Sequence, residues 1–213
     1  MNRWFGFLFI IFSVGFITAC SSDDEDEPYP SLITEMVIFG TDGNSHTIML
    51  TDNGVRYSVD NDLISLLPNT IVRAMCGYVP DKTGTAKIYT LAAVRILKDQ
   101  TTIKGTHVND PVGFVSSWKS GRFINLHLLP KTQANPINHL WGFFRDNQRV
   151  NSVGGTTYEL SVYHEQGDDP LAYSSDVYLS LSIDSVSKIF SNKDSIELTI
   201  HGFDKDRMLR YGK

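Results

Sequence analysis

Cysteine is scarce in this chain of 213 residues, which contains only Cys20 and Cys76. Two cysteines allow at most one disulfide, so the class of small secreted domains held together by several disulfides is excluded. The chain also lacks a Cys-x-x-Cys pair, a His-Glu-x-x-His pair, a Gly-x-Ser-x-Gly elbow and a phosphate-binding glycine loop. These absences exclude the enzymes that short motifs reveal, but not glycosidases, whose two catalytic carboxylates carry no short motif.

An excess of basic charge is missing as well. The chain carries 19 Lys and Arg against 24 Asp and Glu, and without Arg3 and the five acids of residues 23–27 the numbers become 18 and 19. The part of the chain that can fold is therefore close to neutral and offers no field that would attract a phosphate backbone. We expect no nucleic-acid partner, and no motif indicates a cofactor.

The first 19 residues, in contrast, carry a strong signal. Arg3 precedes an apolar run over residues 4–17 that is too short for an ordinary membrane span and is typical of a secretory signal peptide. The run ends in Ile17-Thr18-Ala19-Cys20, which resembles the lipobox of bacterial lipoproteins, whose cysteine is acylated when the signal peptide is removed. We expect a signal peptide over residues 1–19 and a lipid on Cys20, with a plain secretory signal as the alternative.

Residues 20–30 follow with five consecutive acids at positions 23–27 and then Pro28-Tyr29-Pro30. Such a run repels itself and cannot join a hydrophobic core, which predicts a solvated tether. An acidic run directly after a lipidated cysteine resembles the export signal of surface lipoproteins in the Bacteroidota lineage. This resemblance implies a lipid-anchored protein of the outer membrane at the cell surface, and the periplasmic face is the alternative.

Beyond the tether, apolar residues alternate with period two between clusters of turn residues, and long helical patterns are absent. This pattern is typical of antiparallel sheets. Strands are predicted at residues 34–39, 45–51, 55–59, 69–79 and 85–97. Residues 60–68 predict a helical turn or compact loop. Five strands with this interruption predict an OB-like barrel over residues 31–100, although a small SH3-like barrel or an open meander would give nearly the same pattern.

A polar stretch at residues 98–111 predicts a domain boundary, so that residues 101–213 form a second domain. Strands are predicted at residues 112–119, 122–130, 139–145, 158–163, 176–184, 195–203 and 207–211, and a helical turn at 185–190. Most of these strands alternate on one side only. Since a sheet with one apolar face must bury it against another sheet, the second domain is predicted to be an antiparallel β-sandwich. The fold class is therefore all-β.

Two stretches suggest a family. Residues 117–126 (SWKSGRFINL) and 173–180 (YSSDVYLS), together with the lipobox and the acidic tether, resemble the NigD-like lipoproteins. The resemblance implies an OB-like domain followed by a β-sandwich, in agreement with the strand pattern. The family is named after a gene group tied to bacteriocin production, and the resemblance brings no activity and no functional residue.

Candidate functional residues are aromatic side chains, histidines and carboxylates. Aromatic residues on a wet sheet face would indicate a protein or glycan partner, although tryptophans in a sandwich often belong to the core. The candidates for such a surface are Trp118, Trp141, Phe143, Tyr163, Tyr173 and Tyr178. Tyr163 and Tyr178 lie opposite the faces of their strands that are predicted to point inward. Cys76 alternates with the apolar residues of its strand and is expected to be a buried small hydrophobe.

A metal ion is not expected, but the loop at residues 164–170 is the best candidate for a cation site. It places one imidazole beside three carboxylates, from His164, Glu165, Asp168 and Asp169. A solvated turn explains the same composition.

The function expected from the sequence is that of a membrane-anchored, non-enzymatic binding module with a protein or glycan partner. One alternative is a bacteriocin-associated or immunity-type protein. A further alternative is an envelope hydrolase that works through two facing carboxylates.

Overall fold

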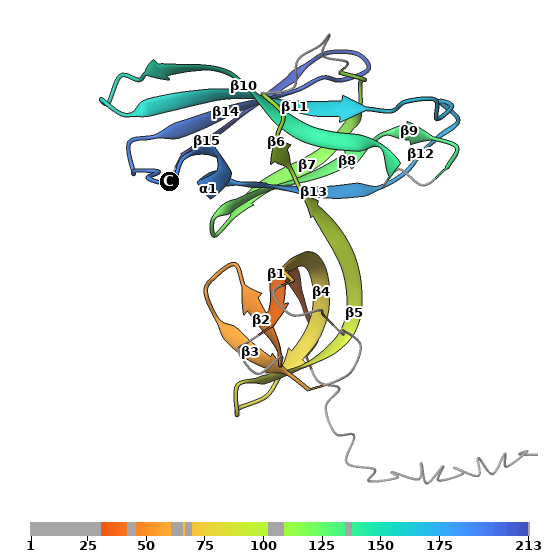
Figure 1. The fold of residues 1–213 in the computed structure, drawn as a ribbon, viewed down its shortest axis with the longest axis vertical. Helices are drawn as coiled ribbons and strands as arrows, with labels where there is room; N and C mark the ends of the chain where they lie inside the picture. The colour runs from red at the N-terminus through yellow and green to blue at the C-terminus, as the bar shows by residue number, and fades with distance from the viewer. Residues whose placement is uncertain are drawn as a thin grey trace, which may run out of the picture. The chain divides into compact units, whose positions relative to one another are not determined.

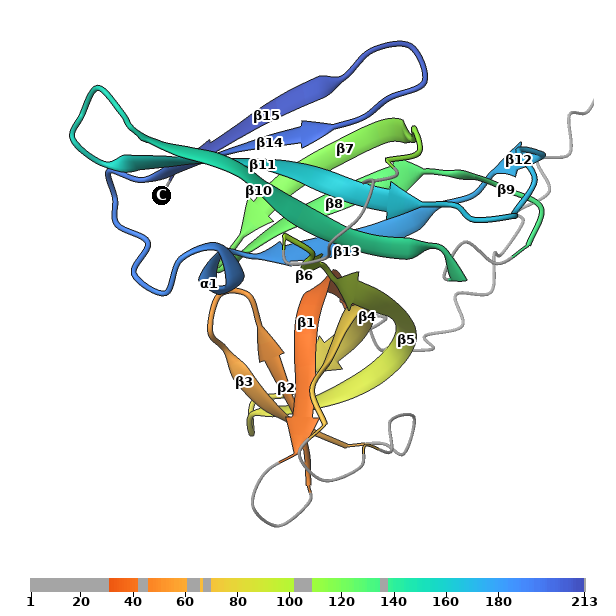
Figure 2. The same cartoon turned by 45° about the horizontal axis from the view of Figure 1, so that its top comes forward.

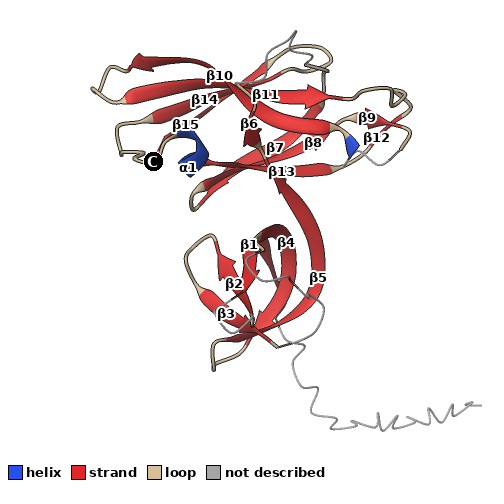
Figure 3. Ribbon diagram, viewed as in Figure 1, coloured by secondary structure: helices blue, strands red, loops and turns tan. Residues whose placement is uncertain are grey.

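The described chain folds almost entirely into strands (Figure 1, Figure 3). The computed structural model describes residues 31–41, 46–60, 66, 70–101, 109–134 and 138–212. The predicted signal peptide, Cys20 with its tether, and most of the predicted turn at residues 60–68 lie outside these residues. Residues 31–213 form one compact unit. Within the described ranges, no helix is long and apolar enough to cross a membrane.

The first five strands close into a barrel. They are β1 (Ile33–Thr41), β2 (Thr47–Thr51), β3 (Arg56–Val59), β4 (Val72–Pro80) and β5 (Thr85–Ile96). The hydrogen-bonded order is β3-β2-β1-β4-β5, and β3 also pairs with β5 in parallel, which closes the sheet. This connectivity is consistent with the predicted OB-like barrel. The interior is filled by Val37, Phe39, Met49, Ala74, Cys76, Tyr78, Ala86 and Ile88.

Strand β5 continues from the barrel into the sandwich (Figure 1, Figure 2). At its end, Arg95 and Ile96 pair in parallel with β13 (Val177–Ser182). The next residue, Leu97, is 1% exposed and belongs to the sandwich core. After Leu97, the short strand β6 (Lys98–Asp99) pairs in parallel with β10 (Leu140–Val150) in the other sheet. The chain therefore crosses between the two sheets at Leu97.

The sandwich has two main sheets. The first continues the barrel sheet in the order β5-β13-β8-β7, and the second has the order β15-β14-β11-β10-β6. The strands not yet given are β7 (Gly113–Ser120), β8 (Phe123–Leu129), β11 (Thr156–Glu165), β14 (Ser195–Ile200) and β15 (Arg207–Gly212). A small separate sheet pairs β9 (Lys131–Thr132) with β12 (Tyr173–Ser174).

The alternation predicted for the sandwich strands is confirmed by burial. The inward residues are Ile124, Leu126 and Leu128 of β8, Leu179 and Leu181 of β13, and Ile196, Leu198 and Ile200 of β14, each at most 1% exposed. The predicted helical turn is found earlier than expected, as α1 (Ile183–Val186), because Ile183 and Val186 are the apolar residues that reach the core. Among the described strands, three pairings in the sandwich are parallel, namely β11 with β14, β13 with β5 and β10 with β6.

A buried ion pair connects the barrel to the sandwich. Arg73 of β4 donates from Nη1 and Nη2 to the two carboxylate oxygens of Asp52, over 2.6 and 2.7 Å. Its Nε donates to Ser180 Oγ over 3.0 Å, and Nη2 donates to Asn125 Oδ1 over 3.1 Å. Arg73 and Asp52 belong to the barrel, whereas Ser180 and Asn125 belong to the sandwich. The arginine therefore ties the two parts together through bonds that lie away from water.

Candidate functional site

Strands β5 and β13 pair over two residues of each and then separate. The pairs are Arg95 with Leu179 and Ile96 with Ser180. Earlier in β13, Tyr178 pairs with β8 on one side, and no described strand pairs with it on the other. The residues of β5 before Arg95 pair with β4, and among the described strands their other edge is paired only near the start of β5. The two strands therefore form a fork that opens away from Arg95 and Leu179.

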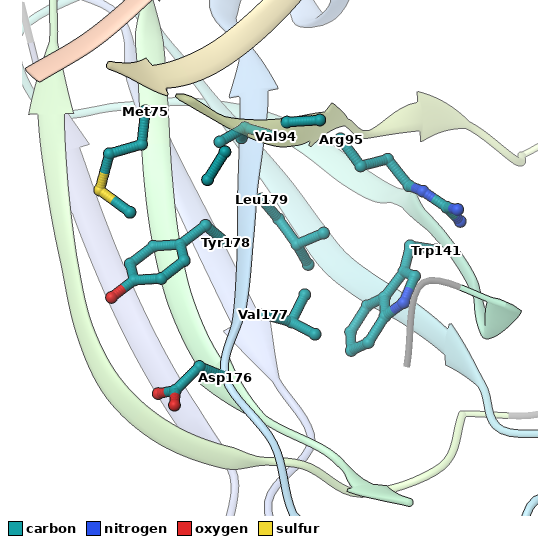
Figure 4. Close-up of a pocket in the computed structure, with 10 residues that line it drawn as sticks. Met75, Val94, Arg95, Trp141, Asp176, Val177, Tyr178 and Leu179 are labelled. Atoms are coloured by element: carbon teal, nitrogen blue, oxygen red, sulfur yellow. The ribbon is translucent and has the colours of Figure 1, made fainter. Parts of the chain in front are cut away.

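A cavity of about 520 Å³ occupies this fork. It is lined by Met75, Ala92, Ala93, Val94, Arg95, Trp141, Asp176, Val177, Tyr178 and Leu179. Figure 4 shows Met75 and Tyr178 on one side and Trp141 and Arg95 on the other. All lining residues except Arg95 and Asp176 are apolar or aromatic. A largely apolar wall with a few charged groups is typical of ligand-binding pockets.

A second cavity, also of about 520 Å³, shares the wall formed by Ala93, Val94, Arg95 and Trp141 with the first. It is further lined by Ile71, Val72, Arg73, Ile96 and Lys98. The charged residues that line the second cavity are all basic. The second cavity, next to the fork, is therefore bordered by basic side chains, whereas the first is largely apolar with one arginine and one aspartate.

Two buried histidines hold the wall of the pocket in place. Trp141 stacks on His164 with 4.1 Å between ring centroids and 22° between the ring planes. His164 in turn contacts His139, whose Nδ1 lies 2.9 Å from His164 Nε2. The backbone carbonyl of His139 accepts a hydrogen bond from Arg95 Nη1 over 2.9 Å. The same histidine pair therefore positions both Trp141 and Arg95.

The protonation of His164 follows from its partners. Its Nδ1 lies 3.0 Å from the carbonyl oxygen of Asp110, and since a carbonyl only accepts, Nδ1 carries the proton. His164 Nε2 then accepts from His139 Nδ1. Burial lowers the pKa of His164 to about 4, because the interior disfavours the charged imidazolium. The neutral ring that this favours is the one that the hydrogen bonds require.

Asp169 completes the chain of hydrogen bonds. It accepts from the Thr132 hydroxyl, from the backbone N–H of Gln133 over 2.8 Å and from that of Ala134 over 3.2 Å. These donors lower its pKa to about 2, with the Thr132 hydroxyl as the largest cause. Asp169 Oδ2 also lies 2.9 Å from His139 Nε2, and an ionised carboxylate can only accept. His139 therefore has a hydrogen-bonding partner at each ring nitrogen, His164 at Nδ1 and Asp169 at Nε2.

The opposite side of the pocket is held by another histidine. His127 stacks on Tyr178 with 4.3 Å between ring centroids and 17° between the planes. Its Nε2 lies 2.6 Å from Asp176 Oδ1. The position of the pocket's carboxylate, on Asp176, is therefore fixed from outside the cavity.

The candidate cation loop is used for folding contacts. His164 and Asp169 belong to the chain of hydrogen bonds just described, and Glu165 accepts from the hydroxyl of Tyr163. Within the described ranges, no three His, Cys, Asp or Glu side chains converge as metal ligands would. The structure therefore does not bring His164, Glu165, Asp168 and Asp169 together around one point.

The family follows from the sandwich. The family model of the NigD-like C-terminal beta sandwich domain matches residues 95–210, which is more than half of the chain. The chain belongs to the NigD-like family. The match begins at Arg95, the residue at which β5 joins the sandwich sheet. No curated protein matches this NigD-like chain.

Solved structures share the fold of this NigD-like protein. A NigD-like immunity protein from Bacteroides caccae is 25% identical, with a TM-score of 0.64 over 87% of this chain and 94% of that chain. A protein from Parabacteroides distasonis, provisionally described as toxin-related, is 12% identical, with a TM-score of 0.69 over 86% and 93%. A protein from Bacteroides fragilis, provisionally described as a lipoprotein, is 13% identical, with a TM-score of 0.58 over 85% and 97%.

The predicted aromatic surface is not one surface in this NigD-like protein. Trp141 and Tyr178 line the pocket, although Trp141 is 6% exposed and belongs to the core cluster. Tyr163 is buried too, edge-on against Phe144 at 5.1 Å between ring centroids, so its placement on a wet face was wrong. Trp118 on β7 and Tyr173 on β12 are 36% and 53% exposed and do not line the pocket. Phe143, with 0% exposure, is part of the sandwich core.

Sequence reasoning missed most of the site. Arg95, Val94 and Met75 lie on predicted strands, but nothing in their spacing shows that β5 meets β13 there. One signal was present in Arg73, a lone charge among the apolar residues of a predicted strand, because an arginine is almost never fully buried without a partner. The pairing of His139 with His164 depends on the register of β10 and β11, in which Trp141 lies opposite His164.

Proposed function

We propose that this NigD-like protein is a lipid-anchored protein of the bacterial envelope that binds a partner polypeptide and does not transform it. The observation that carries the proposal is the apolar pocket in the fork between β5 and β13. Its wall is fixed from behind by the histidines and includes Trp141, Tyr178 and Met75. Aromatic and methionine side chains in a preformed concavity suit the apolar side chain of a partner.

The carboxylates of the pocket favour binding over hydrolysis. Among the described residues that line it, Asp176 alone carries a carboxylate. Glycoside hydrolysis uses two carboxylates on either side of the bond, separated by about 5 to 10 Å. The described lining of the pocket does not offer that pair, so the hydrolase alternative has no support here.

The proposed anchor rests on the lipobox-like Ile17-Thr18-Ala19-Cys20 and on the acidic residues that follow. The likeness to the Bacteroides fragilis protein, which carries a lipoprotein description, agrees with it. We place the protein in the outer membrane with its folded part at the cell surface. Mass spectrometry of the mature protein should find the acylated cysteine at the N-terminus, and a free thiol there would refute the anchor.

Binding at the pocket can be tested in living cells. A photo-crosslinking amino acid at Ala92 should give a discrete adduct with a protein, and the additional substitution Ala93→Trp, which fills the pocket, should abolish it. The same crosslinker at Val153, which is 61% exposed and does not line the pocket, is the control. The proposal fails if Ala92 and Val153 give the same adducts, or if a glycan array shows pocket-dependent binding instead.

A second candidate function, immunity against a bacteriocin, is favoured by the Bacteroides caccae immunity protein, which is 25% identical. In that case the bound partner is a toxin. Deletion of the gene should then sensitise the cells to bacteriocins of related strains, and the Ala93→Trp variant should fail to restore protection. Unchanged sensitivity of the deletion strain would dispose of this function and leave the binding proposal to the crosslinking test.

A further inference from the structure

Both arms of the fork are strand edges, so the fork offers main-chain groups as well as an apolar wall. On β13, the carbonyl of Ser180 accepts a hydrogen bond from Leu97 N–H over 2.8 Å, which directs the main chain of Ser180 toward β5. Main-chain groups alternate in direction along a strand, so those of Tyr178 point to the same side, where β5 has already moved away. The fork therefore exposes hydrogen-bonding groups on the β13 arm.

The β5 arm offers a longer edge. Residues 90–94 pair with β4 in continuous register, and none of the described strands pairs with their other edge. Natural proteins protect such edges with charges, prolines or bulges. A bulge at Tyr89 shifts the register of β5 against β4, but the segment after it, Thr90-Leu91-Ala92-Ala93, has no charge, no proline and no further register shift, and Leu91 is 41% exposed. An uncharged edge that no described strand covers is a template for another strand.

The charges around the fork indicate which chemical groups an occupant of the fork has. The pocket is largely apolar, and the neighbouring second cavity has Arg95 and Lys98, both exposed. An occupant that fits both cavities has an apolar group in the pocket and an anionic group near the two cations. A glycan or a fatty-acyl chain lacks the alternating N–H and C=O groups that strand edges bind.

We propose that an extended segment of a partner polypeptide adds as a strand in the fork between β5 and β13. An apolar side chain of the segment enters the pocket, and an acidic side chain contacts Arg95 and Lys98. Side chains of a strand return to the same face every second residue, so the acid lies two positions from the apolar residue. This inference rests on the proposed function and specifies its mode of binding, strand addition to an exposed edge.

The test uses the full-length mature protein in detergent and a displayed library of linear dodecapeptides. Peptides are selected on the unmodified protein and counter-selected on Ala93→Trp, and Val153→Trp is the control for adding a tryptophan elsewhere. We expect enriched peptides that carry an apolar residue with Asp or Glu two positions away. Thermal melting of both variants shows whether they are folded as the unmodified protein is.

Backbone methylation then tests the strand itself. N-methylation of residues in the paired segment of a selected peptide should weaken binding about tenfold per site, because each removes a main-chain donor to one of the two arms, and residues outside that segment should tolerate it. Replacing the acid by its amide should weaken binding about five- to tenfold, and less so in high salt. If no N-methylation matters, or if no peptide is enriched against folded Ala93→Trp, strand addition is refuted.

The two proposals fail separately. A pocket-dependent adduct at Ala92 in cells, together with insensitivity to N-methylation, overturns strand addition and leaves the binding function standing. Loss of both the adduct and the enriched peptides overturns both. Selected peptides that bind the Val153→Trp and Ala93→Trp variants equally well place the binding surface outside the fork, which also refutes the inference.

Discussion

Replacing Asp52 by asparagine removes the counter-ion of a guanidinium that has no contact with solvent. The side chains of Arg73 and Asp52 are 0% and 2% exposed. Their two hydrogen bonds, over 2.6 and 2.7 Å, form a bidentate pair. An asparagine offers one acceptor and turns an N–H group toward the other guanidinium nitrogen. The Asp52→Asn variant therefore keeps the shape of the contact but leaves a buried positive charge without its partner.

The expected cost is about 3 to 5 kcal/mol of the free energy of unfolding, the usual cost of breaking one member of a buried ion pair. Part of the charge stays solvated by the Ser180 and Asn125 oxygens and by the ring of Phe123, whose centroid lies 3.7 Å from Arg73 Cζ. The effect should therefore lie toward the lower end of that range. A typical domain has only about 5 to 15 kcal/mol in total, so the variant should be clearly less stable.

Urea denaturation followed by tryptophan fluorescence and circular dichroism measures the difference. The matched control is Asp184→Asn in the surface pair of Arg122 and Asp184, whose side chains are 54% and 41% exposed. That substitution should cost less than about 1 kcal/mol. Combining Asp52→Asn with Arg73→Met should recover part of the loss, because the unpaired charge is gone.

The reasoning is refuted if Asp52→Asn costs no more than Asp184→Asn while the dependence on urea stays the same. That result would mean that water reaches the guanidinium and replaces the lost carboxylate. Two separate unfolding transitions in the unmodified protein would contradict the role of Arg73 as a tie between barrel and sandwich.

Three further predictions follow from single residues. The pKa of His164 is about 4 in the folded protein and 6.5 in the unfolded chain, so the unfolded state binds the extra proton first as pH falls. Urea denaturation should therefore show up to about 3 kcal/mol of stability lost between pH 6.5 and pH 4. A stability that does not change over this range would contradict the burial of His164 as a neutral ring. Gly121→Ala should destabilise the protein more than Gly84→Ala in the same assay. Both glycines have positive φ, but of the two only a Cβ at Gly121 would meet a backbone oxygen, that of Asp52, at 2.3 Å. Equal effects would show that the turn at Gly121 can move. Cys76 is fully buried, and burial raises the pKa of its thiol to about 11. The thiol should therefore resist iodoacetamide at pH 8 until the protein is unfolded. Rapid labelling of the native protein would mean that the barrel opens.

The alternation of apolar residues along the strands predicted most of the fold. Ile196, Leu198 and Ile200 alternate along the strand predicted at residues 195–203 and have 0% exposure, because a strand in a one-sided sheet has two faces that differ in hydrophobicity. The parallel pairing of β11 with β14 was not predictable in the same way. Alternation says which side of a strand is buried and nothing about the direction of its neighbour.

The candidate site was largely beyond the sequence. Trp141 and Tyr178 were candidates, but for an exposed aromatic face, and Trp141 instead forms a pocket wall that is stacked on His164. Arg95 is about 80 residues from Tyr178 along the chain, and only the short pairing of β5 with β13 brings them to one cavity. Local patterns do not encode where two strands stop pairing.

The sequence by itself determined the all-β character, the inward faces of the sandwich strands and the near-neutral charge, because these follow from residue type and period. Tertiary structure alone decided three features: the closure of the barrel by β3 and β5, the burial of Arg73 against Asp52, and the fork that holds the pocket. Each of these depends on contacts between segments far apart in the chain. The free energy of these contacts comes from groups that are distant in sequence and meet only when the chain has folded.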